Sequence, residues 1–202
     1  MCIRDRAEYA TVPIINALSD LEHPCQSLAD LLTIQEKKGT LAGLNLAYIG
    51  DGNNISNSLM LACSLAGIHF RIASPVGYEV DNKLLAQSKA FAADTGASIT
   101  LTDDPILAVQ NADIVYTDVW VSMGQETEAE KRRAAFDGFQ VTDKLISLAR
   151  KNTIFMHPLP AHHGEEISAG VLENSHSVVF DQAENRLYAQ KAVLARLLSQ
   201  TG

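Results

Sequence analysis

Residues 113–126 read Asp-Ile-Val-Tyr-Thr-Asp-Val-Trp-Val-Ser-Met-Gly-Gln-Glu, and the rest of the chain is organised around them. The apolar run 113–117 predicts a buried strand that ends at Asp118, and a Ser-Met-Gly turn follows at 122–124. In an open parallel sheet, ligands bind outside the carboxyl ends of the strands. We therefore expect Asp118 to face a ligand. The alternative is that Asp118 only caps the segment that follows.

Strand-like and helix-like segments alternate along the chain on both sides of this stretch. Strands are expected at 44–49, 69–73, 98–101, 113–117, 153–156 and 177–180. Helices are expected at 55–66, 82–94, 105–110, 143–151 and 183–198. Such alternation predicts an α/β fold with a doubly wound, Rossmann-like parallel sheet. The helix that begins near His23 and the last helix have no obvious place in this sheet, so we expect them to dock on something absent from this chain.

Composition excludes several classes of protein. The chain has 202 residues and a net charge of −8, which argues against an extended polyanion such as nucleic acid as a partner. No apolar run is long enough to cross a membrane, and the first residues lack the apolar core of a signal peptide. The three cysteines have no metal-ligand spacing, and their odd number suits a reducing compartment. These features predict a soluble, cytoplasmic protein.

Polar residues follow three of the expected strands, at 50–54, 118–124 and 157–159. Because the carboxyl ends of parallel strands share one edge of the sheet, these residues should meet there. His23-Pro-Cys-Gln26 adds the start of a helix, where free N–H groups and the dipole attract an anion. An ordinary proline-started helix with an incidental histidine is the alternative. Together these features predict a cleft between the α/β domain and another part of the protein.

Two other interpretations of the polar residues are weaker. Gly50 and Gly52 are followed by asparagines and not by the third glycine of a dinucleotide-binding loop, and no acid ends the second strand. A nucleotide-binding oxidoreductase domain is therefore disfavoured. The side-chain amides of the asparagines suit a small polar ligand better, and the alternative for Asn53 is that it only shapes the turn. The loop with His162, His163, Glu165 and Glu166 lacks the helical spacing of a zinc motif, so we expect it to be solvated.

Five motifs together resemble the ornithine carbamoyltransferases. They are His23-Pro-Cys-Gln26, Asp51-Gly-Asn-Asn54, residues 118–126, His157-Pro-Leu-Pro160 and Glu184-Asn-Arg186. The Ser-Met-Gly loop is the most specific, because it separates the ornithine enzymes from the aspartate carbamoyltransferases. The resemblance covers nearly the whole chain from about Val12 onward.

The resemblance also implies a division of the chain. In the family a carbamoyl phosphate domain with a Ser-Thr-Arg-Thr phosphate loop comes first, and this sequence does not contain that loop. We therefore expect a fragment, in which 1–22 is the end of the preceding region with the interdomain linker, 23–40 is an interdomain helix and 41–182 is the ornithine-binding domain. Residues 183–202 would be a helix that packs back on the carbamoyl phosphate domain.

The family implies a role for each site residue. His23 and Gln26 would contact the carbamoyl group, and Arg186 would contact carbamoyl phosphate. Ornithine would be held by Asn54, Asp118, Ser122 and Met123. Pro158 stands where the family usually has a cysteine that is thought to assist at the reacting amine. Pro158 and Leu159 would also belong to the carbamoyl phosphate-binding residues, and both can still offer their backbone carbonyls.

The implied reaction transfers a carbamoyl group from carbamoyl phosphate to the side-chain amine of ornithine and gives citrulline and phosphate. Asp118 would position the amine rather than deprotonate it, because a nearby acid favours the charged amine. No metal or organic cofactor is expected. The full protein would be a homotrimer or a higher oligomer that serves arginine biosynthesis or a urea-cycle-type reaction. The alternatives are another amine substrate, such as putrescine or an N-acylated ornithine, and a non-catalytic relative.

Overall fold

A computed structural model describes residues 3–122 and 124–199 and contains a five-stranded, fully parallel sheet. The strand order is β3-β2-β1-β4-β5, with bounds β1 Asn45–Ile49, β2 His69–Ala73, β3 Ile99–Thr102, β4 Ile114–Thr117 and β5 Ile154–Met156. The order reverses between β1 and β4, as in a doubly wound sheet. The predicted α/β fold is confirmed, and the carboxyl ends of β1, β4 and β5 lie next to one another.

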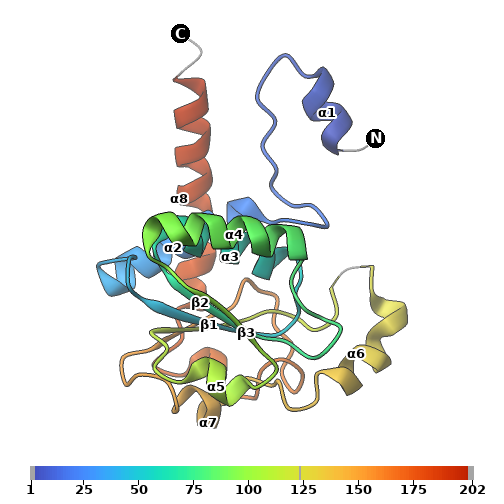
Figure 1. Ribbon diagram of the computed structural model, residues 1–202, viewed down its shortest axis with the longest axis vertical. Helices are drawn as coiled ribbons and strands as arrows, with labels where there is room; N and C mark the ends of the chain where they lie inside the picture. Colours follow the sequence, from blue (N-terminus) through green and yellow to red (C-terminus); the bar gives the residue numbers. More distant parts are fainter. Residues whose placement is uncertain (1–2, 123, 200–202) are drawn as a thin grey trace.

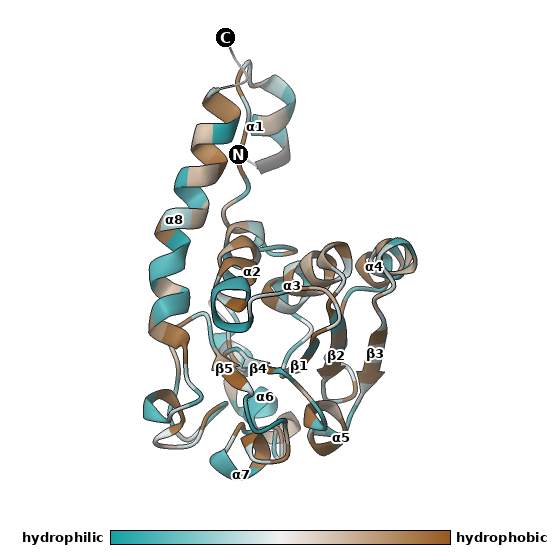
Figure 2. Cartoon of the chain, turned by 90° about the vertical axis from the view of Figure 1, so that its left-hand side faces the viewer, coloured by the Kyte–Doolittle hydropathy of each residue, from teal (hydrophilic) through white to brown (hydrophobic). Residues whose placement is uncertain are grey.

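Helices cover both faces of the sheet (Figure 2). One face carries α2 (Pro24–Lys38), α3 (Asn54–Ala66) and α4 (Asn82–Thr95), and the other carries α5 (Pro105–Val109), α6 (Ala129–Ala135) and α7 (Asp143–Ile146). Because side chains alternate along a strand, β4 sends Ile114 and Tyr116 into the core beside α3 and Val115 into the core beside α5 and α7. All four residues of β4 are therefore buried, as expected for a strand covered on both faces.

Two expected elements at the carboxyl-terminal end of the domain are wrong. Residues 177–180 do not form a strand: Ser177 makes only an isolated bridge to Phe155, and α8 (Val179–Leu198) begins immediately afterwards. The β-branched pair Val178 and Val179 favours a strand locally, but Val179 is fully buried in the first turn of the helix. The helix expected at 143–151 is also shorter, because α7 ends at Ile146 and the chain continues in turns.

The helices α2 and α8 do have a place in this fold, contrary to the expectation from the sequence. They pack against each other, and α2 also packs against α3. Asp30 and Thr33 of α2 are fully buried, and each accepts a hydrogen bond from an amide of α8. The carboxyl-terminal part of α8 extends beyond the body of the domain (Figure 1), and Leu187 and Leu194 of this helix are 59% and 50% exposed.

Three short elements complete the description: α1 (Ile3–Tyr9), η1 (Glu126–Glu128) and η2 (Val171–Glu173). Within residues 3–122 and 124–199, no helix combines the length and the apolar composition needed to span a lipid bilayer.

Candidate active site

The polar strand ends and the start of α2 meet at one cavity of about 570 Å³. Every described residue that the sequence predicts for the site lines it, namely His23, Gln26, Asn54, Asp118, Ser122, Pro158, Leu159 and Arg186. Met123, predicted to hold ornithine, lies outside the described residues. Residues more than 160 positions apart in the sequence therefore border one cavity.

Asp118 lies at the end of β4 and is only 7% exposed. Its Oδ2 accepts a hydrogen bond of 2.7 Å from Asn53 Nδ2. Burial is the main reason why the pKa of Asp118 lies above its ordinary value; the charge of Glu166 adds to the rise, and the bond from Asn53 opposes it. A buried acid with one amide donor that also borders a cavity is suited to receive a cationic group from a ligand.

The two asparagines after β1 have different tasks. Asn53 is the N-cap of α3, because its Oδ1 accepts from the backbone N–H groups of Ile55 and Ser56 at 3.0 and 3.1 Å. Asn53 does shape the turn, but the alternative that it only shapes the turn is wrong, because it also donates to Asp118. Asn54 donates from Nδ2 to the carbonyl of Ser19 at 2.8 Å, so its Oδ1 remains the group that it can offer to the cavity.

His23 is the N-cap of α2, but its side chain makes no capping bond. Its backbone N–H donates to Ser58 Oγ at 2.7 Å, and its buried Nδ1 has no partner. Burial lowers the pKa of His23, and the charge of Arg186 lowers it further. The imidazole is therefore neutral at neutral pH and stands close to a guanidinium at an anion-attracting helix end.

Gln26 lies in the first turn of α2 and is 1% exposed. Its Nε2 donates to Asp30 Oδ1 at 2.9 Å, whereas its buried Oε1 has no partner. An unpartnered buried acceptor is costly, so it marks a place where a ligand can supply the missing donor.

The chain after β5 is held by a buried histidine. Leu159 N donates to His157 Nδ1 at 2.9 Å, which leaves His157 Nε2 as the donor to Glu166 Oε1 at 3.2 Å. This arrangement supports Leu159 in the left-handed region at φ 55°, a conformation unfavourable for leucine. Pro158 and Leu159 are half-buried and border the cavity.

The prediction that residues 161–166 form a solvated loop is wrong for Glu166. His162 is exposed, but Glu166 is 0% exposed and its Oε1 also accepts from the backbone N–H of His162 at 2.6 Å. Charged residues are rarely fully buried without a partner, and here the partner is the buried His157. Among the residues that the structure describes, no three His, Cys, Asp or Glu side chains are arranged to hold a metal ion.

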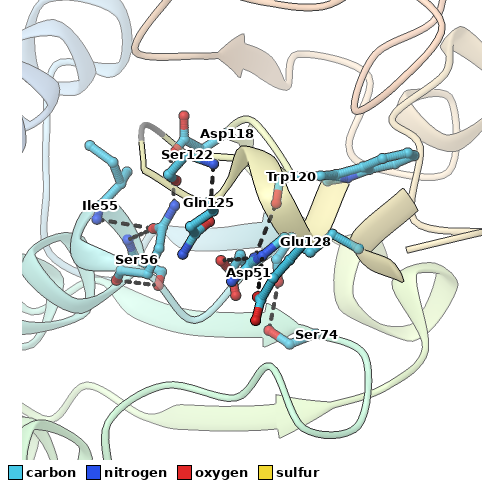
Figure 3. Close-up of polar contacts among 12 residues, drawn as sticks. Asp51, Ile55, Ser56, Ser74, Asp118, Trp120, Ser122, Gln125 and Glu128 are labelled. Carbon is cyan, nitrogen blue, oxygen red and sulfur yellow. Dashed lines mark hydrogen bonds and ion pairs between the residues drawn. The ribbon is translucent and has the colours of Figure 1, made fainter. Parts of the chain in front are cut away.

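A second, larger cavity of about 1110 Å³ adjoins the first and shares Asn54 and Ser122 with it. The loop after β4 borders both cavities, and Ser122 N donates to Gln125 Oε1 at 3.1 Å within it (Figure 3). Arg132, on α6, forms a buried ion pair with Asp51 at 2.7 Å and donates to the carbonyl of Trp120. This pair ties α6 to the end of β1 and so fixes both ends of the loop.

The sequence did not predict three features in and around the site. They are the bond from Asn53 to Asp118, the ion pair of Asp51 with Arg132, and the buried acid Asp30. A signal for Asp30 was available, because Gln26 and Asp30 are four residues apart in an expected helix and therefore share a face. The other two contacts join residues 65 and 81 positions apart, and no local pattern indicates such pairs.

Two family models match the chain. The model described as "Aspartate/ornithine carbamoyltransferase, Asp/Orn binding domain" matches residues 42–197. The model described as "Aspartate/ornithine carbamoyltransferase, carbamoyl-P binding domain" matches residues 2–36, which include most of α2.

Similarity to individual proteins indicates the same family. The chain is 58% identical over 192 residues to an ornithine carbamoyltransferase of Trichormus variabilis and 54% identical over 196 residues to an anabolic one of Pyrococcus furiosus. These alignments cover 95% and 97% of the chain but only 62% of each relative. The solved P. furiosus ornithine carbamoyltransferase superposes with a TM-score of 0.92, over 96% of this chain and 62% of that one. The structure titled ornithine transcarbamoylase from Giardia lamblia, at 35% identity, gives 0.88 over 95% and 65%. The chain therefore belongs to the aspartate/ornithine carbamoyltransferase family.

Proposed function

We propose that this chain forms the ornithine-binding part of an enzyme that transfers the carbamoyl group of carbamoyl phosphate to the side-chain amine of ornithine. The observation that carries the proposal is the 570 Å³ cavity, which has a buried acid at one strand end and, elsewhere on its wall, an anion-attracting helix start close to the guanidinium of Arg186. Asp118 suits an ammonium group, and His23 with Arg186 suits a phosphorylated carbonyl compound. Relatives named ornithine carbamoyltransferase, at 54–58% identity, support the assignment of both substrates.

The residues have distinct roles in the proposed reaction. Asn54, Asp118, Ser122 and Met123 hold ornithine, and the amine attacks the carbamoyl carbon in its neutral form. His23 donates a hydrogen bond to the carbamoyl oxygen as negative charge develops on it, and a neutral imidazole can do so because one ring nitrogen carries a proton. Arg186 contacts the phosphate, which leaves with the proton of the amine. Asp118 orients the amine, since an ionised acid next to it favours the charged, unreactive form.

Pro158 takes the place of the cysteine that the family usually has. It has neither a thiol nor an N–H, so the backbone carbonyls of Pro158 and Leu159 are the groups that this segment offers to the reacting amine. The left-handed conformation of Leu159, supported by His157, sets the direction of those carbonyls.

The rest of the enzyme is also part of the proposal. Residues 1–22 end a carbamoyl phosphate domain, 23–40 and 183–202 connect to it, and 41–182 bind ornithine, with α8 beginning at Val179. The exposed Leu187 and Leu194 of α8 would pack on that domain. The complete protein would be a cytoplasmic homotrimer that serves arginine biosynthesis.

The test uses a completed enzyme, defined here as this chain joined to the part of the P. furiosus relative that it does not span. We expect the completed enzyme to form citrulline from ornithine and carbamoyl phosphate, and the 202-residue chain alone to form none above background. Putrescine and N-acetylornithine, supplied in place of ornithine, test the alternative amines. Absence of carbamoyl transfer to ornithine, or faster transfer to one of the other two amines, would contradict the proposal.

A further inference from the structure

Asp30 lies one helical turn after Gln26, is 0% exposed, and does not border the cavity. Both of its carboxylate oxygens are used. Oδ1 accepts from Gln26 Nε2 at 2.9 Å and from Gln182 Nε2 at 2.7 Å, and Oδ2 accepts from the Tyr116 hydroxyl at 3.1 Å. A fully buried acid at the junction of α2, α8 and β4 is unusual, because burial of a charge is costly unless its partners compensate.

The direction of every bond in this group is fixed. Gln182 Oε1 accepts from the backbone N–H of His157 at 2.9 Å, so the amide nitrogen of Gln182 must face Asp30. An ionised Asp30 can only accept, so the amide nitrogen of Gln26 must face it as well. The carbonyl oxygen of Gln26 is thereby turned away from Asp30 and is the atom that has no partner beside the cavity.

We propose that Asp30 is a positioning residue for carbamoyl transfer: it holds the amide of Gln26 so that its oxygen accepts a hydrogen bond from the carbamoyl NH2 group. The inference rests on the proposed function. Through Gln182 the same carboxylate is joined to the backbone at the end of β5, so the two sides of the cavity share one buried anchor. Without Asp30 the amide of Gln26 is free to rotate. Its NH2 group would then face the NH2 group of the substrate, and two donors cannot form a hydrogen bond with each other.

Three substitutions separate positioning from general support of the fold. Asp30→Leu removes both acceptor oxygens, and Asp30→Asn keeps the shape and one acceptor. Thr33→Val is the matched control, because Thr33 accepts from Asn185 of α8 at 3.0 Å on the same buried face of α2 and donates to the Ala29 carbonyl, not to Gln26.

In the completed enzyme we expect Asp30→Leu to raise the KM for carbamoyl phosphate about tenfold or more, the effect of losing one well-placed hydrogen bond. The KM for ornithine should change less than about threefold, and Asp30→Asn should recover most of the loss in carbamoyl phosphate affinity. Thr33→Val should leave both constants within the same limit. Equal losses for both substrates, or a loss in Thr33→Val as large as in Asp30→Leu, would overturn the inference.

A second measurement does not depend on turnover. In the unmodified 202-residue chain, the side-chain NH2 signals of Gln26 in a ¹⁵N correlation spectrum should be protected from exchange with solvent. Asp30→Leu should abolish this protection while leaving the backbone signals of α2 in place, and Thr33→Val should preserve it. Unprotected Gln26 signals in the unmodified chain would overturn the positioning role even if citrulline forms. Protected signals in an inactive completed enzyme would contradict the proposed function alone.

Discussion

Asn53 joins the acid of the site to the start of a helix: its Nδ2 donates to Asp118 Oδ2 at 2.7 Å, and its Oδ1 accepts from two backbone N–H groups of α3. The orientation of Asp118 thus depends on the geometry of the helix cap. Because the amide oxygen is committed to the cap, the nitrogen is the only end of this side chain that can reach Asp118. The parallel pairing of β1 with β4 brings the two strand ends together.

Asn53→Ala should therefore affect both folding and binding. We expect it to lower the free energy of unfolding by about 1–3 kcal/mol, from the lost cap and the unsatisfied acid. It should also raise the KM for ornithine in the completed enzyme. Asp81→Ala is the control, because Asp81 caps α4 in the same way without touching Asp118. An equal effect of both substitutions on ornithine would show that Asn53 is only a cap.

The ion pair of Arg132 with Asp51 should be important for stability. The Arg132 side chain is 9% exposed and also donates to a backbone carbonyl, so Arg132→Met leaves a buried acid without its cation. We expect a loss of about 3–5 kcal/mol in the free energy of unfolding, measured with urea. Arg133→Met, which removes the exposed partner of Glu165, should cost less than about 1 kcal/mol. Similar losses for the two neighbours would contradict this account.

Asp30 should make stability depend on pH. Burial raises its pKa to about 6, above the ordinary value of 3.8, so the folded state binds the proton more tightly than the unfolded state. The sign follows: this contribution to stability is fully present below pH 3.8 and is lost as the pH rises through 6. Compared with Asp30→Asn, the unmodified chain should lose about 1 kcal/mol per pH unit between those values. A pH-independent difference between the two proteins, measured by urea unfolding from pH 4 to 7, would contradict the shift.

The sequence predicts the fold better than it predicts the contacts at the site. Parallel strands and the strand-end rule place Asp118, Asn54 and Leu159 correctly, because both depend on local patterns. The start of α8 could not be predicted, since Val178 and Val179 favour a strand and only the tertiary packing decides otherwise.

The sequence also did not predict which acidic residues are buried. Asp30 and Glu166 were missed because charged residues are mostly exposed in folded proteins, and the spacing of Gln26 and Asp30 indicates a shared helix face but not the burial of that face. The partners of Asp30 in β4 and α8 lie 86 and 152 positions away in the sequence. Only the folded chain brings these partners to the carboxylate.

Pro158→Cys tests whether the family's thiol matters in this enzyme. The position lines the cavity, and cysteine keeps the backbone carbonyl that proline offers. Because the leaving phosphate can accept the proton of the amine and a thiol with a pKa of about 8.5 is a poor base, we expect turnover to change less than about threefold. The measurement is turnover against pH with saturating ornithine. A rise of about tenfold, equivalent to about 1.4 kcal/mol, would restore the thiol as a working group.

The most direct test of the central claim is the effect of Asp118→Asn on the two substrates of the completed enzyme. Asp113→Asn is the matched control, because Asp113 is a buried acid at the opposite end of the same strand. A charge-assisted bond to an ammonium contributes about 1.5–3 kcal/mol, so Asp118→Asn should raise the KM for ornithine roughly 10- to 100-fold and leave that for carbamoyl phosphate nearly unchanged. Equal changes for both substrates, or the same change in Asp113→Asn, would contradict the claim that Asp118 holds ornithine.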